Sequence, residues 1–115
     1  MKTVEEINDG LSNFYGTENY WKNDILKFQY TDGVKFLWES CDAYWLLIAI
    51  SSYNRKEHFQ SWILTVNDDN SAVLKMQEDK GEPWLVQQEI PFTDFPLKEI
   101  NLWLIDGILI LPSEY

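Results

Sequence analysis

The sequence predicts a single α+β domain, with two or three N-terminal helices packed on one face of a mainly antiparallel sheet of four to six strands. Helical periodicity marks the first half of the chain, and alternating or β-branched stretches mark the second half. Helices followed by strands are typical of a segregated α+β domain. The length of 115 residues suits one continuous core and is too short for two that fold independently.

The first predicted helix spans residues 3–14. Thr3 can cap its N-terminus, and Glu6 stands three residues later, in the register of a capping box. Four apolar residues then share one face of this helix: Val4, Ile7, Leu11 and Phe14. Gly10 lowers helix propensity by about 1 kcal/mol relative to alanine, so we expect fraying toward the turn that follows.

A short strand is predicted over residues 25–30, where aliphatic and aromatic residues occupy alternate positions. Thr31 or Asp32 can then cap a second helix. The apolar positions of this helix recur at helical spacing and are Val34, Leu37, Trp38 and Cys41. The pattern therefore places Cys41 on the buried face.

The apolar run AYWLLIAI, residues 43–50, is compatible with a buried helix or with a buried strand. Its composition favours a helix, Asp42 offers an N-cap, and an end is signalled by Ser51, Ser52 and Asn54. A helix that is apolar nearly all round is expected to lie centrally in the fold.

The second half of the chain carries strand and turn signals. Residues 59–67 and 72–77 predict a hairpin, because β-branched and alternating runs flank a polar turn. Residues 84–90 predict a further strand. The range 91–96 is a loop held by two prolines.

A closing hairpin is predicted over residues 98–111. Asp106-Gly107 separates two apolar runs, and this dipeptide is typical of a type I′ turn because both central residues require positive φ. The two strands are apolar on both faces in places. We therefore expect the helices to cover one face and a partner to cover the other.

Acidic residues outnumber basic ones by 19 to 9, for a net charge of −10. Residues 68–115 hold 10 acids and 3 bases and so carry −7 of this charge. Binding to nucleic acid or to an anionic membrane depends on clustered lysine and arginine, so neither is an expected partner. The longest apolar run falls well short of the roughly 20 residues that cross a bilayer. With one cysteine and no apolar leader, a cytoplasmic location is expected.

The sequence predicts no catalytic residue, no metal site and no cofactor. Cys41 and His58 are the single residues of their types, but Cys41 belongs to an apolar helix face and His58 to a polar segment. Two such residues are too few for a zinc site. The glycines form neither a P-loop nor a dinucleotide-binding motif.

Five segments spread over nearly the whole chain carry a resemblance: YGTENYW, YTDGVKFL, DAYWLLIAI, IPFTDFPL and LPSEY. Together they are similar to a small bacterial protein family that is known only as uncharacterised. The resemblance implies a compact bacterial domain. It implies no particular activity, ligand or catalytic residue.

The function that the sequence favours is protein interaction without catalysis. An acidic surface lies beside an apolar hairpin and aromatic residues of the kind that anchor protein interfaces. The predicted binding residues are Trp21, Trp84, Phe92, Asp94, Phe95, Trp103 and Tyr115. The expected partner is another protein or a second copy of the chain, bound through the 98–111 hairpin.

Two alternative functions are compatible with the sequence. The acidic surface could imitate a polyanion and occupy the basic groove of a nucleic-acid-binding protein. In the other alternative, two carboxylates beside aromatic rings hydrolyse a glycosidic bond, and the candidates are Asp32, Asp42, Asp94 and Glu114. Caps and turns explain the first three of these carboxylates equally well.

Overall fold

The strands form one sheet in the order β1-β2-β7-β6-β3-β4-β5. The computed structural model describes residues 2–53 and 55–115, so Asn54, predicted to help end a helix, lies outside the described residues. Within them the elements are α1 (Val4–Leu11), β1 (Tyr20–Trp21), β2 (Gln29–Thr31), α2 (Asp32–Cys41), α3 (Tyr44–Ser52), β3 (Phe59–Val66), β4 (Ala72–Gln77), β5 (Val86–Ile90), β6 (Glu99–Ile105), β7 (Ile108–Ile110) and a 3-10 turn, η1 (Pro112–Glu114).

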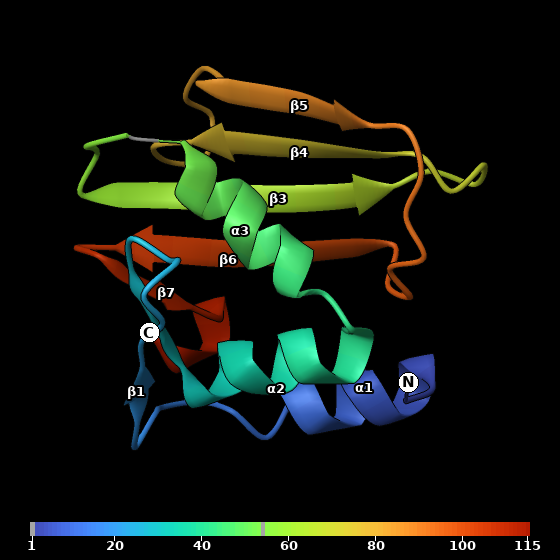
Figure 1. Ribbon diagram of the computed structural model, residues 1–115, viewed down its shortest axis with the longest axis horizontal. Coiled ribbons are helices and arrows are strands. Elements are labelled where there is room, and N and C mark those ends of the chain that lie inside the picture. Colours follow the sequence, from blue (N-terminus) through green and yellow to red (C-terminus); the bar gives the residue numbers. More distant parts are fainter. Residues whose placement is uncertain (1, 54) are drawn as a thin grey trace.

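The α+β class is confirmed, but the number and order of the predicted strands are wrong. The sheet has seven strands rather than four to six, and β1 and β2 precede α2 in the chain. The sheet is also mixed, because β2 pairs with β7 in parallel while the other neighbours are antiparallel. Figure 1 shows α3 crossing in front of β3 and β6, with α1 and α2 lying together beyond β7.

The first helix follows the sequence prediction closely. The Glu6 backbone N–H donates to Thr3 Oγ1 at 3.2 Å, and the Thr3 N–H donates to Glu6 Oε1 at 3.0 Å, which completes the capping box. A Cβ at Gly10 would overlap the ring of Phe36 in α2. The glycine that weakens α1 locally therefore allows the two helices to approach closely.

Asp42 does not cap α3, so that prediction is wrong. It ends α2 instead, in the left-handed conformation with φ 51°, which aspartate adopts more readily than most residues. The N-cap position of α3 is Ala43. The helical interpretation of residues 43–50 is confirmed, although Ile48 is 42 % exposed and α3 therefore covers the sheet with one side only.

The predicted strand over residues 25–30 is also largely wrong. Only its last two residues belong to β2, which is Gln29–Thr31. Leu26 and Phe28 are buried as expected, but they lie in a turn region, where the Leu26 N–H donates to the Asn23 carbonyl. The alternation of apolar residues therefore predicted correctly which side chains are buried, but it did not predict whether the segment pairs as a strand.

Both predicted hairpins form. Ala72–Gln77 pairs with β3, and the β6–β7 turn has φ 49° at Asp106 and 83° at Gly107, as a type I′ turn requires. Strand β5 begins at Val86, two residues later than predicted. No helix within the described residues is long and apolar enough to cross a membrane.

The core lies between the helices and one face of the sheet. The strand residues on that face are almost fully buried: Tyr30, Trp62, Leu64, Leu74, Met76, Leu102 and Leu109. They form one cluster with helix residues Ile7, Leu37, Leu46, Leu47 and Ile50. Cys41 belongs to this cluster, as its helical spacing predicts.

The end of the chain is tied to the start of α2 through Glu114. Its Oε1 accepts from Thr31 Oγ1 at 2.6 Å and from the Leu111 N–H at 2.9 Å, and its Oε2 accepts from the Gly33 N–H at 3.1 Å. A Cβ at Gly33 would lie 2.7 Å from the Glu114 carboxyl carbon. Glycine at position 33 is therefore what lets the carboxylate reach the N-terminus of the helix.

We expect Glu114→Ala to lower the free energy of unfolding by about 2–3 kcal/mol, because three donors, one of them a buried hydroxyl, lose a charged acceptor. Urea unfolding followed by fluorescence measures this change. Glu78→Ala, at an exposed turn position, is the matched control and should change stability by less than about 0.5 kcal/mol. Equal stability of the two variants would contradict a structural role for Glu114.

Candidate functional site

The second face of the sheet is not covered by the helices, and we call it the open face. Strand alternation and register define its residues, which are Tyr20, Gln29, Thr31, Phe59, Ser61, Ile63, Thr65, Val73, Lys75, Gln77, Gln87, Glu89, Glu99, Asn101, Trp103, Ile105, Ile108 and Ile110. Its charged members are Lys75 in β4, Glu89 in β5 and Glu99 in β6. None of the three lies next to the β6–β7 turn. Around the β6–β7 hairpin the strands of the open face therefore carry no charged residue, although Glu114 of η1 lines the groove beside them.

Apolar and aromatic side chains gather on this uncharged part. The ring centroid of Trp103 lies 5.2 Å from that of Phe59 and 5.7 Å from that of Tyr115, which meets it edge to face. A shallow groove of about 310 Å³ adjoins these rings. We call the whole group the aromatic patch; its members are Tyr20, Phe59, Trp103, Ile105, Ile108, Ile110 and Tyr115.

Three elements of the chain position the aromatic patch. The type I′ turn fixes the register of β6 and β7, so that Trp103 stands opposite Ile110 and Ile105 opposite Ile108. The Glu114 carboxylate holds η1, and Tyr115 follows directly and packs on Trp103. Tyr115 is nevertheless 82 % exposed, because only one edge of its ring meets the protein.

Asp32 positions the third element, the segment that carries Tyr20. Its carboxylate accepts hydrogen bonds from the Trp21 indole at 2.9 Å and from the Glu18 backbone N–H at 3.1 Å. The Trp21 hydrogen bond is the main reason why the pKa of Asp32 is lowered from its usual range. A carboxylate held ionised in this way supports the loop structurally and is poorly suited to act as a general acid.

The structure brings together only some of the predicted binding residues. Trp103 and Tyr115 contact each other in the aromatic patch, while Phe92 and Asp94 line a separate hollow beside Trp45 in α3. The remaining two exposed tryptophans stand apart, and each lies under a lysine: Trp21 under Lys35 at 4.8 Å and Trp84 under Lys75 at 5.1 Å.

Phe95 is not an exposed residue, contrary to expectation. It is 5 % exposed and belongs to the core cluster, because the loop after β5 turns this side chain inward. The sequence prediction named the 98–111 hairpin as a contact but did not single out its isoleucines Ile105, Ile108 and Ile110, and it did not include Phe59. Alternate residues of a strand point to the same face. This rule would have assigned Ile105 and Ile110, the two hairpin isoleucines closest to Trp103, to the same face as Trp103.

The residues considered for nucleophilic catalysis do not form a site. Cys41 is fully buried in α2, and burial raises the pKa of its thiol to about 11. His58 is instead an exposed residue before β3, where its Nδ1 lies 3.0 Å from Asp106 Oδ1. The described residues include no group of three or more histidine, cysteine or carboxylate side chains arranged to hold a metal ion.

The carboxylates considered for glycosidic hydrolysis have structural roles in most cases. Asp32 and Glu114 accept several hydrogen bonds each, and Asp42 ends α2. Asp94 is exposed in the hollow beside Trp45 and Phe92. Asp94 and Glu114 line two different hollows.

Comparison with protein families gives one match, a family described as "Family of unknown function (DUF6876)", over residues 5–115. The chain belongs to this family. Because the match extends from α1 to the last residue, it includes every element of the sheet and the whole aromatic patch. No curated protein and no solved structure matches the chain significantly. Membership thus agrees with the resemblance to an uncharacterised family and assigns no activity.

We expect Cys41 to react very slowly with a thiol-specific disulfide reagent in the folded protein. With a pKa of about 11, roughly one thiol in a thousand is ionised at pH 8, and the core blocks access to it. Absorbance of the released thiolate measures the rate. The same protein in urea is the control and should react at least about 100-fold faster. Comparable rates in the folded and unfolded states would show that Cys41 is accessible.

Proposed function

We propose that this protein is a non-catalytic interaction domain that binds a second copy of itself through the aromatic patch. The observation that carries the proposal is a cluster of aromatic and aliphatic side chains, most of them exposed or half-buried, on strands that bear no charge there, in a chain whose net charge is −10. Tryptophan and tyrosine are the residues that most often anchor protein interfaces. Trp103 and Tyr115 occupy this role at the centre and rim of the patch.

The open face has the dimensions that a stable contact needs. The molecule measures 35 × 35 × 29 Å, so one face has room for the roughly 800 Å² per partner of a standard interface. Burial of apolar surface contributes ~25 cal/mol per Å² to the free energy of association. The entropy lost when side chains become ordered and two molecules become one opposes this contribution. The β-sheet holds Phe59 and Trp103 rigidly, which keeps this ordering cost small.

Charge limits the places where a second copy can bind. Two molecules of charge −10 repel each other, and an approach through acidic surfaces is unfavourable. At the strands of the aromatic patch two copies can meet without charged side chains opposite each other, and the carboxylate that lines the groove, Glu114, is already engaged by hydrogen bonds within its own chain. A two-fold axis through the patch would also make each Trp103 available to the same groove of its partner.

The polyanion-mimic alternative has weaker support. It rests on net charge, and it requires a basic partner to bind where acidic side chains are dense. The aromatic patch has no such side chains on its strands. We also propose a cytoplasmic location, because the single cysteine is a buried packing residue and forms no disulfide.

Light scattering after gel filtration tests self-association. We expect a molar mass near twice the chain mass of 13.7 kDa at about 100 µM protein, and Tyr115→Asp should shift the mass toward the monomer by placing a charge in the contact. Tyr115 is 82 % exposed, so the variant is expected to fold. Phe92→Asp, at a residue 69 % exposed in the other hollow, is the matched control and should stay dimeric.

Salt separates self-association from the alternative. Higher salt screens the repulsion between two acidic copies, so the dimer should persist or become stronger. Binding of a basic partner to an acidic surface would instead weaken steeply with salt. A wild-type protein that stays monomeric at every concentration, or a dimer that Phe92→Asp disrupts and Tyr115→Asp does not, would overturn the proposal.

A further inference from the structure

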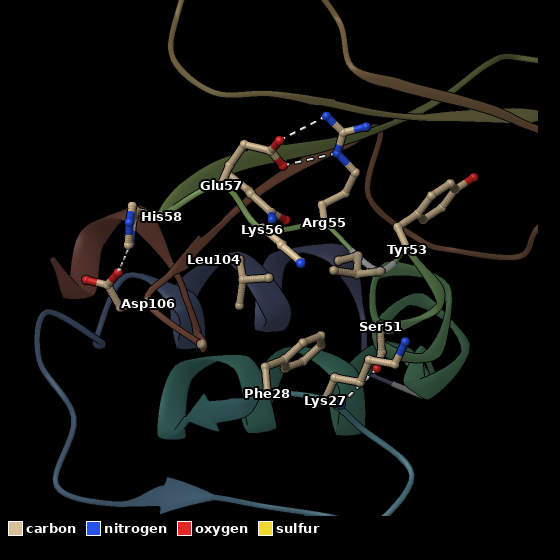
Figure 2. A pocket seen from close by; sticks show the side chains of 13 residues that line it. Lys27, Phe28, Ser51, Tyr53, Arg55, Lys56, Glu57, His58, Leu104 and Asp106 are labelled. Carbon is tan, nitrogen blue, oxygen red and sulfur yellow. Dashed lines mark hydrogen bonds and ion pairs between the residues drawn. The ribbon is translucent and has the colours of Figure 1, made fainter.

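A second concave region lies on the helix side of the sheet, at the end where β3 begins. Its volume is about 270 Å³, and three segments form its walls: residues 27–28, the α3–β3 connection, and the β6–β7 turn. Figure 2 shows the side chains that line it. We call this cavity the basic pocket, because three of the nine lysines and arginines of the chain, Lys27, Arg55 and Lys56, line it together with the single histidine.

The charge of the basic pocket is opposite to that of the whole molecule. Lys27, Arg55 and Lys56 outweigh Glu57 and Asp106, which leaves +1 with neutral histidine, on a chain of net charge −10. A local field of this sign inside a concavity concentrates small anions.

Both acids of the basic pocket already have a side-chain partner. Glu57 accepts two hydrogen bonds from Arg55, from Nε at 3.1 Å and from Nη2 at 2.9 Å, and this contact lowers the pKa of Glu57. Asp106 contacts His58. Among residues 2–53 and 55–115, neither Lys27 nor Lys56 forms an ion pair. Figure 2 shows the Lys56 side chain directed over the cavity.

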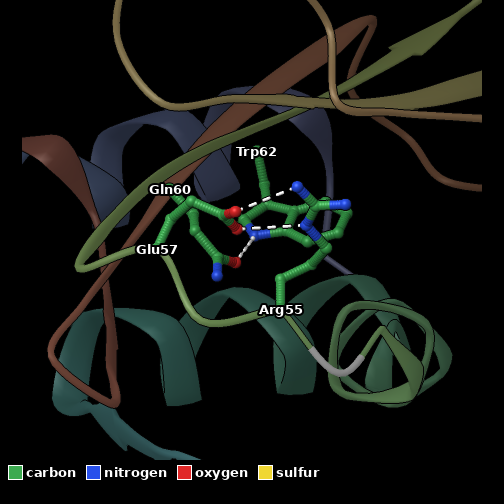
Figure 3. Close-up of polar contacts among 4 residues, drawn as sticks. All are labelled: Arg55, Glu57, Gln60 and Trp62. Atoms are coloured by element: carbon green, nitrogen blue, oxygen red, sulfur yellow. Dashed lines mark hydrogen bonds and ion pairs between the residues drawn. The ribbon is translucent and has the colours of Figure 1, made fainter.

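Gln60 on the floor of the pocket supplies a fixed hydrogen-bond donor. This side chain is 3 % exposed, and its Oε1 accepts from the Trp62 indole N–H at 2.9 Å. Because an indole N–H can only donate, the amide oxygen must face Trp62 and the amide nitrogen must face away, as Figure 3 shows. This nitrogen is not one of the buried polar atoms left without a partner, which among the described residues are Trp38 Nε1 and Tyr44 Oη. It reaches the solvent of the pocket, where a bound anion can accept a hydrogen bond from it.

The floor is otherwise apolar and is held in place by hydrogen bonds between the three walls. Phe28 and Ile50 are buried there, and Leu104 is half-buried. The Lys27 N–H donates to Ser51 Oγ at 2.9 Å, the Gln29 N–H to the Gly107 carbonyl at 2.9 Å, and the Asp106 N–H to the His58 carbonyl at 2.9 Å. The pocket therefore exists before any ligand binds.

We propose that the basic pocket binds a small organic acid, with its carboxylate between Lys56 and Gln60 and its apolar body against Phe28 and Leu104. Unpaired donors outnumber free acceptors, which selects an anion, and the apolar floor selects a carboxylate on a hydrocarbon or aromatic body over a bare inorganic ion. The single arginine is engaged by Glu57, so the bidentate fork that favours phosphate is not free. This site is separate from the aromatic patch and independent of self-association.

Two-dimensional NMR of the ¹⁵N-labelled protein tests the proposal, with phenylacetate as the probe at constant ionic strength. We expect the Gln60 side-chain amide and the Trp62 indole signals to shift and to saturate below about 20 mM. Lys56→Met, which keeps the aliphatic stem, should weaken binding about tenfold. Lys80→Met, at an exposed turn position, is the matched control and should leave the affinity unchanged.

Three outcomes would overturn the proposal. The Gln60 and Trp62 signals could stay fixed throughout the titration, or the two lysine variants could bind phenylacetate equally. Inorganic phosphate could also produce the same shifts at lower concentration than phenylacetate, which would assign the pocket to phosphate. A Gln60→Glu variant keeps the acceptor for Trp62 and should retain the fold, but its negative charge should prevent phenylacetate from binding. If this variant still binds phenylacetate, the assigned position of the carboxylate is wrong.

Discussion

A seven-stranded sheet has two faces to cover, and the helices of this chain cover one of them. The α-helices are 8, 10 and 9 residues long, so each spans only about 12–15 Å of a molecule 35 Å wide. Most of the apolar surface that they provide is used on the helix side, where the strand residues are almost completely buried. The open face must therefore remain in solvent or meet another molecule. Its composition follows from this constraint: polar serine, threonine, asparagine and glutamine over most strands, and the aromatic patch where the C-terminal segment meets the segment of Tyr20.

The aromatic patch depends on contacts between distant parts of the chain. Strand β2 pairs in parallel with β7, and Glu114 joins the C-terminal turn to the start of α2. These contacts bring Tyr20, Trp103 and Tyr115 to one region, although they are far apart in sequence. The same hairpin contributes to the basic pocket on the opposite side of the sheet, where Leu104 and Asp106 line the wall. One structural unit thus serves an apolar surface on one face and a cationic cavity on the other.

Local sequence signals predicted the elements that local physics determines. The capping box at Thr3, the helical spacing of Val34 to Cys41 and the Asp106-Gly107 turn were sufficient to predict α1, α2 and the last hairpin. The β2–β7 pairing could not be predicted, because each strand has three residues and their alignment is set by the packing of the whole core. Trp103 and Tyr115 were predicted for the site because they are aromatic beside an apolar hairpin. The basic pocket was not predicted, since its lysines are separated in sequence and its key amide, Gln60, reads as an ordinary strand residue.

The central claim is that the open face is a contact surface for a second copy. Isotope-filtered NMR of an equal mixture of labelled and unlabelled protein measures it most directly, because only contacts between molecules give signals. We expect nuclear Overhauser effects from the rings of Trp103 and Tyr115 in one copy to the methyl groups of Ile105, Ile108 and Ile110 in the other. Intermolecular signals confined to Phe92 and Trp45, or none at a concentration of about 1 mM, would contradict the account.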